Sequence, residues 1–178
     1  NDADFAAIEC RIVNWLAGQN DVLERFRRYD AAKTYEEKNE LDPYRIQAST
    51  IFDVPVARVN KHPQRFVGKQ AELGCGFQLG APGFRRGCLR YGYDLPENLE
   101  FKAVETWRRD HPCVVKLWPA VEKAAVNAIK FKGKVFKPVP EYGWDKDRSK
   151  PLPKFQDIRF GVKNLEGMEF LLLRLPSG

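Results

Sequence analysis

The segment from Pro63 to Gly80 constrains the fold of this chain more than any other. Proline's fixed φ suits the first turn of a helix. After Pro63, long side chains recur at every fourth residue. The repeating side chains are Arg65, Lys69, Leu73 and Phe77. This spacing predicts one helix over 63–80, on which the four side chains form a continuous stripe about 18 Å long. Two cations followed by an aromatic ring suit a nucleoside triphosphate, but the stripe equally suits a helix flank with solvated cations and buried apolar residues.

Two common phosphate-binding motifs are excluded in this segment. A P-loop needs Gly where Pro63 stands and Ser or Thr where Gln70 stands. A dinucleotide-binding turn needs G-x-G-x-x-G, whereas Gly74, Gly76 and Gly80 are spaced one residue too widely. Any nucleotide site here is therefore neither a Walker site nor a Rossmann site.

The composition is that of an ordinary globular chain. Hydrophobic residues make up 43% and charged residues 30% of the 178 residues. No apolar run approaches the roughly 20 residues that cross a bilayer, and no signal peptide is recognisable, so a cytoplasmic location is expected. The four cysteines are dispersed and contain no C-x-x-C pair, which predicts reduced thiols and no zinc site.

Positive charge is concentrated near the end of the chain. The range 130–163 holds ten basic and four acidic residues, and thus as much net charge as the +6 of the whole chain. Such a segment suits a polyanionic partner, of which nucleic acid is the commonest, or it is simply a solvated basic loop.

The hydrophobic pattern predicts an α+β fold that is mainly α. Helices are expected from Ile8 to about Gly18, from about Asn20 to Ala32, from Pro43 to Phe52, over 63–80, over 96–110 and over 114–129, with a helical turn at 56–60. Strands are expected at 131–139, 155–161 and 169–175. The polar range 34–41, the glycine-rich range 80–93 and the proline-rich range 139–154 are expected to be loops, turns or linkers.

The beginning of the chain carries a second candidate site. Asp4 is followed by Phe5 and Glu9 at the start of the first expected helix. Carboxylates in this arrangement suit a divalent cation, although Asp4 alone suits a helix N-cap. The run from Asp4 to Ile12 resembles motif A of the family A DNA polymerases, and Arg65-x-x-x-Lys69-x-x-x-Leu73-Gly74-x-x-Phe77 resembles motif B of that family, in phrasing closest to the bacteriophage members.

The resemblance implies DNA synthesis from dNTPs on a primer-template by a two-Mg²⁺ mechanism. Asp4 and the Phe5 carbonyl would hold Mg²⁺, and Glu9 would exclude a ribose 2′-hydroxyl. Arg65 and Lys69 would hold the triphosphate, as catalytic groups together with Asp4. Leu73 and Phe77 would contact the sugar and the base.

Three departures from the family pattern are visible. Leu73 stands where most members have Phe or Tyr, and Phe77 lacks the usual Tyr hydroxyl. Tyr44 stands where many members have a phosphate-binding His. Motif C, which supplies a second metal-binding carboxylate, is not found, so we expect the 178 residues alone to be inactive and to need the rest of a polymerase chain, including palm and thumb.

The resemblance also implies a division of the chain. Residues 1–18 would be a palm segment with motif A, residues 19–130 the helical fingers with motif B, and residues 131–178 a basic loop with strands returning to the palm. Two alternatives stay open: a non-catalytic module that binds nucleic acid or nucleotides, and one half of a split polymerase. A phage protein of this kind would act in the cytoplasm of its host.

Overall fold

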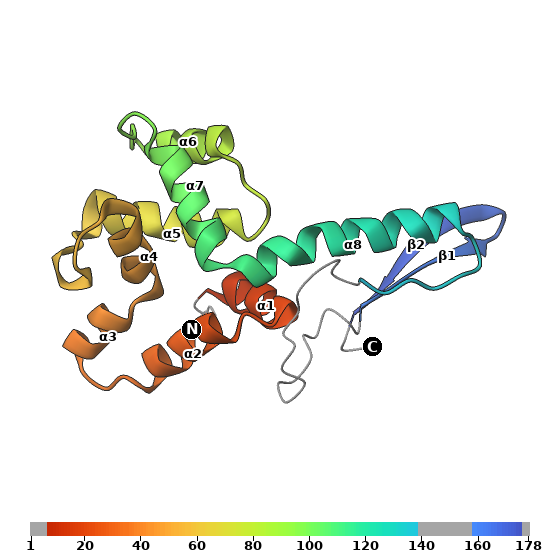
Figure 1. Ribbon diagram of the computed structural model, residues 1–178, viewed down its shortest axis with the longest axis horizontal. Coiled ribbons are helices and arrows are strands. Elements are labelled where there is room, and N and C mark those ends of the chain that lie inside the picture. The colour runs from red at the N-terminus through yellow and green to blue at the C-terminus, as the bar shows by residue number, and fades with distance from the viewer. Residues whose placement is uncertain (1–6, 139–157, 176–178) are drawn as a thin grey trace. The chain divides into compact units, whose positions relative to one another are not determined.

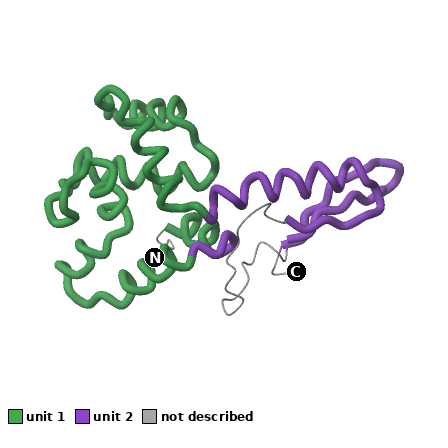
Figure 2. Tube along the Cα trace, in the orientation of Figure 1, with its two compact units in different colours: residues 1–14, 20–112 green, residues 15–19, 113–178 purple. Residues whose placement is uncertain are grey.

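The computed structural model describes residues 7–138 and 158–175. These residues form helices and one two-stranded antiparallel sheet (Figure 1), which confirms the predicted α+β, mainly α class. The chain divides into two compact units (Figure 2). Unit 1 comprises Asn1–Asn14 and Asn20–Pro112, and unit 2 comprises Trp15–Gln19 and Cys113–Gly178.

Unit 1 is built from helices. They are α1 (Ile8–Ala17, whose last turn belongs to unit 2), α2 (Asn20–Ala31), α3 (Tyr35–Leu41), α4 (Pro43–Phe52), η1 (Val56–Arg58), η2 (Lys61–Arg65), α5 (Phe66–Cys75), α6 (Ala81–Arg90) and α7 (Leu99–Asp110). The predicted start of α4 is confirmed, because Pro43 lies in its first turn and the Asp42 carboxylate accepts a hydrogen bond from the Tyr44 amide at 2.8 Å.

The expectation of a loop at 34–41 is wrong. The Glu37 amide donates to the Thr34 hydroxyl at 3.1 Å, and the Glu37 carboxylate accepts from the Thr34 amide at 3.2 Å. This reciprocal capping box begins α3 at Tyr35, although none of the α3 residues is buried. Capping therefore outweighs the polar composition on which the loop was predicted.

The expectation of a turn and linker over 80–93 is also wrong. Pro82 is accommodated in the first turn of α6, while Ala81, Phe84 and Cys88 form its buried face. The Arg85 guanidinium then binds both carboxylate oxygens of Glu100 on α7, at 3.1 and 3.0 Å. Burial and this ion pair outweigh the low helix propensity of the two glycines within α6.

The helix predicted over 63–80 is shorter than expected. Residues 61–65 form the separate turn η2, and α5 ends at Cys75, so Phe77 lies beyond the helix. Arg65, Lys69 and Leu73 keep their spacing along one side, but Phe77 does not extend the stripe. Gly76 is the C-cap of α5. Its amide donates to the Gly74 carbonyl, and the i to i−4 hydrogen bonds of the α-helix do not continue beyond it.

The core of unit 1 depends on a close contact between α4 and α5. Its largest fully buried side chains include Trp107, Phe84, Ile51 and Val67. A Cβ atom at Gly68 would overlap the Tyr44 carbonyl oxygen and lie 2.9 Å from the Ala48 amide nitrogen. Glycine lowers helix propensity, but the close packing of α5 on α4 requires it at position 68.

Unit 2 contains α8 (Pro112–Lys130, from Cys113 onward) and the hairpin of β1 (Arg159–Leu165) and β2 (Met168–Arg174). Pro119 lies inside α8. The predicted strand at 131–139 is wrong over its described residues: they contribute one isolated bridge, Phe136 to Phe160. Residues 155–157, and the whole of the loop expected over 139–154, lie outside the described residues.

The hairpin is apolar but poorly covered. All seven residues of β2 are exposed, including Phe170, Leu171, Leu172 and Leu173, whereas β1 buries Phe160. Among the residues described, no helix has the length and apolar character needed to cross a membrane.

We predict that Gly68→Ala lowers the free energy of unfolding by about 1–3 kcal/mol, because backbone atoms of α4 cannot move aside as a flexible side chain can. Gly87→Ala, also within a helix, is the matched control. Its Cβ would lie 4.0 Å from the nearest atom, so it is expected to be neutral or stabilising by up to about 1 kcal/mol. Urea denaturation of both variants measures the difference, and equal effects would contradict this account of the α4 and α5 contact.

Candidate nucleotide site on α5

The Arg65 side chain is held by two residues at the start of α4. The Arg65 Nε donates to Asp42 Oδ2 at 2.6 Å, while the other oxygen of Asp42 caps α4. The guanidinium also lies over the Tyr44 ring, 5.1 Å from its centroid. Two of the predicted site residues, Arg65 and Tyr44, are thus brought together. Asp42 and Tyr44 fix the Arg65 guanidinium in position.

The Tyr44 side chain is half-buried beside this cation. Burial raises the pKa of its phenol to about 12, with Cys10 and Asp42 adding to the effect. The hydroxyl therefore stays protonated at neutral pH and is able to donate a hydrogen bond.

Lys69 follows Arg65 by one helical turn and has a different environment. Its side chain is exposed, and it makes neither an ion pair nor a hydrogen bond with the residues that the structure describes. A cation in this condition is available to an anionic ligand. Arg65 and Lys69 together therefore form one anchored and one available positive charge along α5.

Leu73 faces the interior rather than the solvent. It is partly buried against a cluster of Cys10, Val22 and Phe26 from α1 and α2. In addition, the Cys10 Sγ donates to the Glu72 carbonyl at 3.0 Å, so α1 is tied to α5 next to Leu73. The helix that carries Glu9 and the helix that carries Lys69 therefore meet at this point.

The remaining predicted residues lie at the edges of this arrangement. Phe77 is 65% exposed in the turn after α5, and Glu9 is exposed in the first turn of α1. Asp4 and Phe5, which were predicted to hold Mg²⁺, lie outside the described residues. Within 7–138 and 158–175, no group of three or more His, Cys, Asp or Glu side chains is placed to hold a metal ion.

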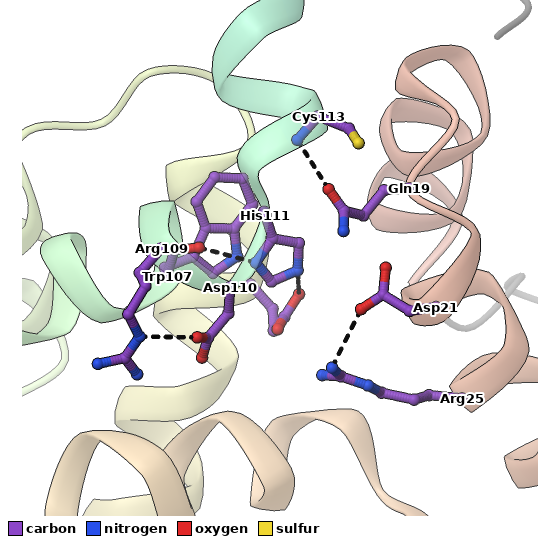
Figure 3. Close-up of polar contacts among 9 residues, drawn as sticks. Gln19, Asp21, Arg25, Trp107, Arg109, Asp110, His111 and Cys113 are labelled. Atoms are coloured by element: carbon purple, nitrogen blue, oxygen red, sulfur yellow. Dashed lines mark hydrogen bonds and ion pairs between the residues drawn. The ribbon is translucent and has the colours of Figure 1, made fainter. Parts of the chain in front are cut away.

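A buried acid and a buried imidazole lie on the inner side of α5. His111, at the C-terminal end of α7, is fully buried, and its Nε2 lies 3.8 Å from Glu72 Oε2. The ring stacks on Trp107 with 4.1 Å between centroids, and Nδ1 lies 2.9 Å from the Trp107 carbonyl oxygen (Figure 3). That bond makes Nδ1 the protonated nitrogen and leaves Nε2 directed toward the carboxyl group.

Burial shifts both groups toward their neutral forms. It raises the pKa of the Glu72 carboxyl from 4.5 to about 7, against the opposing effects of the Trp107 indole and of Arg25. It lowers the pKa of His111 from 6.5 to about 4, against the opposing hydrogen bond to the Trp107 carbonyl. The charged groups nearest to the pair also include Asp21, which binds Arg25 at 3.2 Å, and Asp110, which binds Arg109 at 3.0 Å (Figure 3).

Sequence reasoning did not single out Glu72 or His111. The only local signal is a carboxylate between Ala71 and Leu73 on the apolar side of a helix, a position where an acid needs a partner. Asp42, whose one oxygen caps α4, also holds Arg65 with the other.

Comparison with known proteins links the chain to a polymerase. It is 38% identical over 181 aligned residues to a DNA polymerase of Bacillus phage SP02, and the alignment covers 99% of this chain. The chain spans 22% of the length of that relative. No protein-family profile matches the chain. The chain is therefore homologous to a part of a phage DNA polymerase.

We predict that Glu72→Gln and His111→Asn change the pH dependence of stability in opposite directions. The raised pKa of Glu72 gives a contribution that is complete below pH 4.5 and is lost as the pH rises to about 7. The lowered pKa of His111 gives a contribution that is complete above pH 6.5 and is lost as the pH falls to about 4. In the wild type the two slopes oppose each other.

Relative to the wild type, Glu72→Gln should therefore gain stability as the pH rises from 4.5 to 7, and His111→Asn should gain it as the pH falls from 6.5 to 4. The slopes should approach ~1.4 kcal/mol per pH unit. Urea denaturation at a series of pH values measures them, with Glu97→Gln and His62→Asn as exposed controls. If the free energy of unfolding had the same pH dependence in Glu72→Gln and the wild type, Glu72 would be ionised in the folded protein throughout the range from pH 4.5 to 7.

Proposed function

We propose that this chain is part of a template-directed, family A DNA polymerase that adds dNTPs to a primer 3′-hydroxyl in the cytoplasm of a phage-infected host. The observation that carries the proposal is the 38% identity to a phage DNA polymerase over 99% of the chain. The two motif resemblances support the same assignment. Primer-template DNA and the rest of the polymerase, including motif C of the palm and the thumb, are the partners in this proposal.

In this proposal α5 binds the triphosphate. Lys69 is exposed and unpaired among the described residues, and it contacts the phosphates directly. Arg65 is fixed by Asp42 and Tyr44, so little side-chain entropy is lost when a phosphate binds beside it. The two cations offset the negative charge that grows on the leaving pyrophosphate.

The sugar and the base would lie farther along the same helix. Glu9 is the gate against a ribose 2′-hydroxyl, and the Cys10 bond to the Glu72 carbonyl keeps its helix beside α5. Leu73 influences sugar selection through its place in the interior contact with α1 and α2. Phe77 presents an exposed ring to the base.

Mg²⁺ is assigned to the carboxylate of Asp4 and the carbonyl of Phe5. Both are hard oxygen donors of the kind that Mg²⁺ prefers. When bound, the metal supplies Lewis-acid activation of the α-phosphate and of the primer hydroxyl.

We predict that Lys69→Ala weakens the binding of dTTP about tenfold or more, because a charge-assisted hydrogen bond to a phosphate is lost. Its affinity for thymidine, which has no phosphates, should not change. Isothermal titration of both ligands measures the two effects. Lys33→Ala, which removes another exposed lysine of unit 1, is the matched control and should leave both affinities unchanged.

An equal loss for dTTP and thymidine would mean that Lys69 does not contact the phosphates. Unchanged dTTP binding by Lys69→Ala, together with salt-dependent binding of DNA, would instead support the non-catalytic nucleic-acid-binding module.

A further inference from the structure

A groove of about 590 Å³ runs along the hairpin of unit 2, beside the segment 133–135. Four cationic residues line it, and no carboxylate is among its lining residues in the described part of the chain. The cations are Lys134, Arg159, Lys163 and Arg174. Most of the rest of the lining is apolar and includes Phe160 and Leu172.

The hairpin register brings like charges together. Arg159 on β1 lies directly opposite Arg174 on β2. Because side chains alternate along a strand, Lys163 lies on the same face of β1 as Arg159, about 13 Å away. Like charges directly opposite each other destabilise an antiparallel pair, so the hairpin carries a repulsion that a bound anion would relieve.

Among the described residues of this region, no carboxylate pairs with Lys134, Lys163 or Arg174. In 131–138 and 158–175 the acidic residues are Glu166 and Glu169. Glu169 is already bound by Lys132 at 2.6 Å, and neither acid lines the groove. Lys134, Lys163 and Arg174 form no ion pair with other described residues. Their charge is therefore available to a ligand.

The form of the groove limits the ligand. A cavity of 590 Å³ matches the roughly 300–1,000 Å³ of small-molecule sites, which is enough for a nucleotide or two but not for a double helix. Gly161 contributes no side chain between Arg159 and Lys163, and Arg159 Nη1 donates to the Ile158 carbonyl at 3.0 Å, which restrains that guanidinium. A matching ligand carries anionic groups that meet the cations and apolar parts that meet the rest of the lining.

We propose that this groove binds a single strand of nucleic acid, with Lys134, Lys163 and Arg174 contacting its phosphates and the apolar lining contacting its sugars and bases. The inference rests on the proposed function in taking the strand to be DNA. A span of about 13 Å along β1 separates Lys163 from the Arg159 and Arg174 pair, so the two ends of the groove reach different phosphates of one strand.

The test compares the full 178-residue chain with the variant K134Q/K163Q/R174Q. Binding of fluorescein-labelled dT20 is followed by anisotropy over a series of NaCl concentrations. The variant should bind at least tenfold more weakly, and its slope of log affinity against log salt should be shallower by about 2, since each lost single-strand contact removes about 0.7. The control K33Q/K38Q/R58Q removes three exposed cations of unit 1 and should behave as the wild type.

Three results would overturn the inference: no binding of dT20 by the wild type, an equal loss in the control variant, or tighter binding of a duplex of the same length with the same dependence on the three cations.

Circular dichroism and thermal unfolding establish that the variant folds, and removal of Arg174 should not lower its stability because the repulsion with Arg159 is lost. Binding of dTTP should be unchanged in the variant. A negative result for dTTP binding by Lys69→Ala and a negative result for dT20 binding by the groove variant are therefore distinguishable.

Discussion

The approach of α5 to α4 is the contact on which unit 1 depends. Gly68 allows the backbones to meet, and Asp42 then serves both helices, one oxygen capping α4 and the other binding Arg65. The position of the Arg65 cation is therefore determined by the start of another helix. An arginine held in this way is already oriented before a ligand arrives.

Two charged residues of α5, one turn apart, have opposite environments. Lys69 is exposed, while Glu72, one turn further along the helix, is buried against His111 and Cys10. An acid with a pKa of about 7 and an imidazole with a pKa of about 4 coexist as neutral groups below neutral pH, which avoids the cost of two buried charges. The inner face therefore joins α1, α5 and α7 through polar groups without a buried ion pair.

Much of the fold could be predicted from local patterns, and the errors have physical causes. Pro43 marked the start of α4 because the fixed φ of proline suits the first turn of a helix. The helices α3 and α6 were missed because polarity and glycine were given more weight than the Thr34 and Glu37 box and the buried Phe84. In the candidate site, the spacing of Arg65 and Lys69 was predictable. The partners Asp42 and His111 were not, because they come from positions 23 and 39 residues away from Arg65 and Glu72.

The exposed strand β2 has a practical consequence for the protein in solution. It pairs with β1 on one edge, and its side chains are apolar on both faces and exposed along its whole length. A strand of this kind is a template for pairing with another chain. Concentration-dependent association of the purified protein should therefore begin at the hairpin, and a lysine placed near the middle of β2 should keep the protein monomeric at higher concentrations.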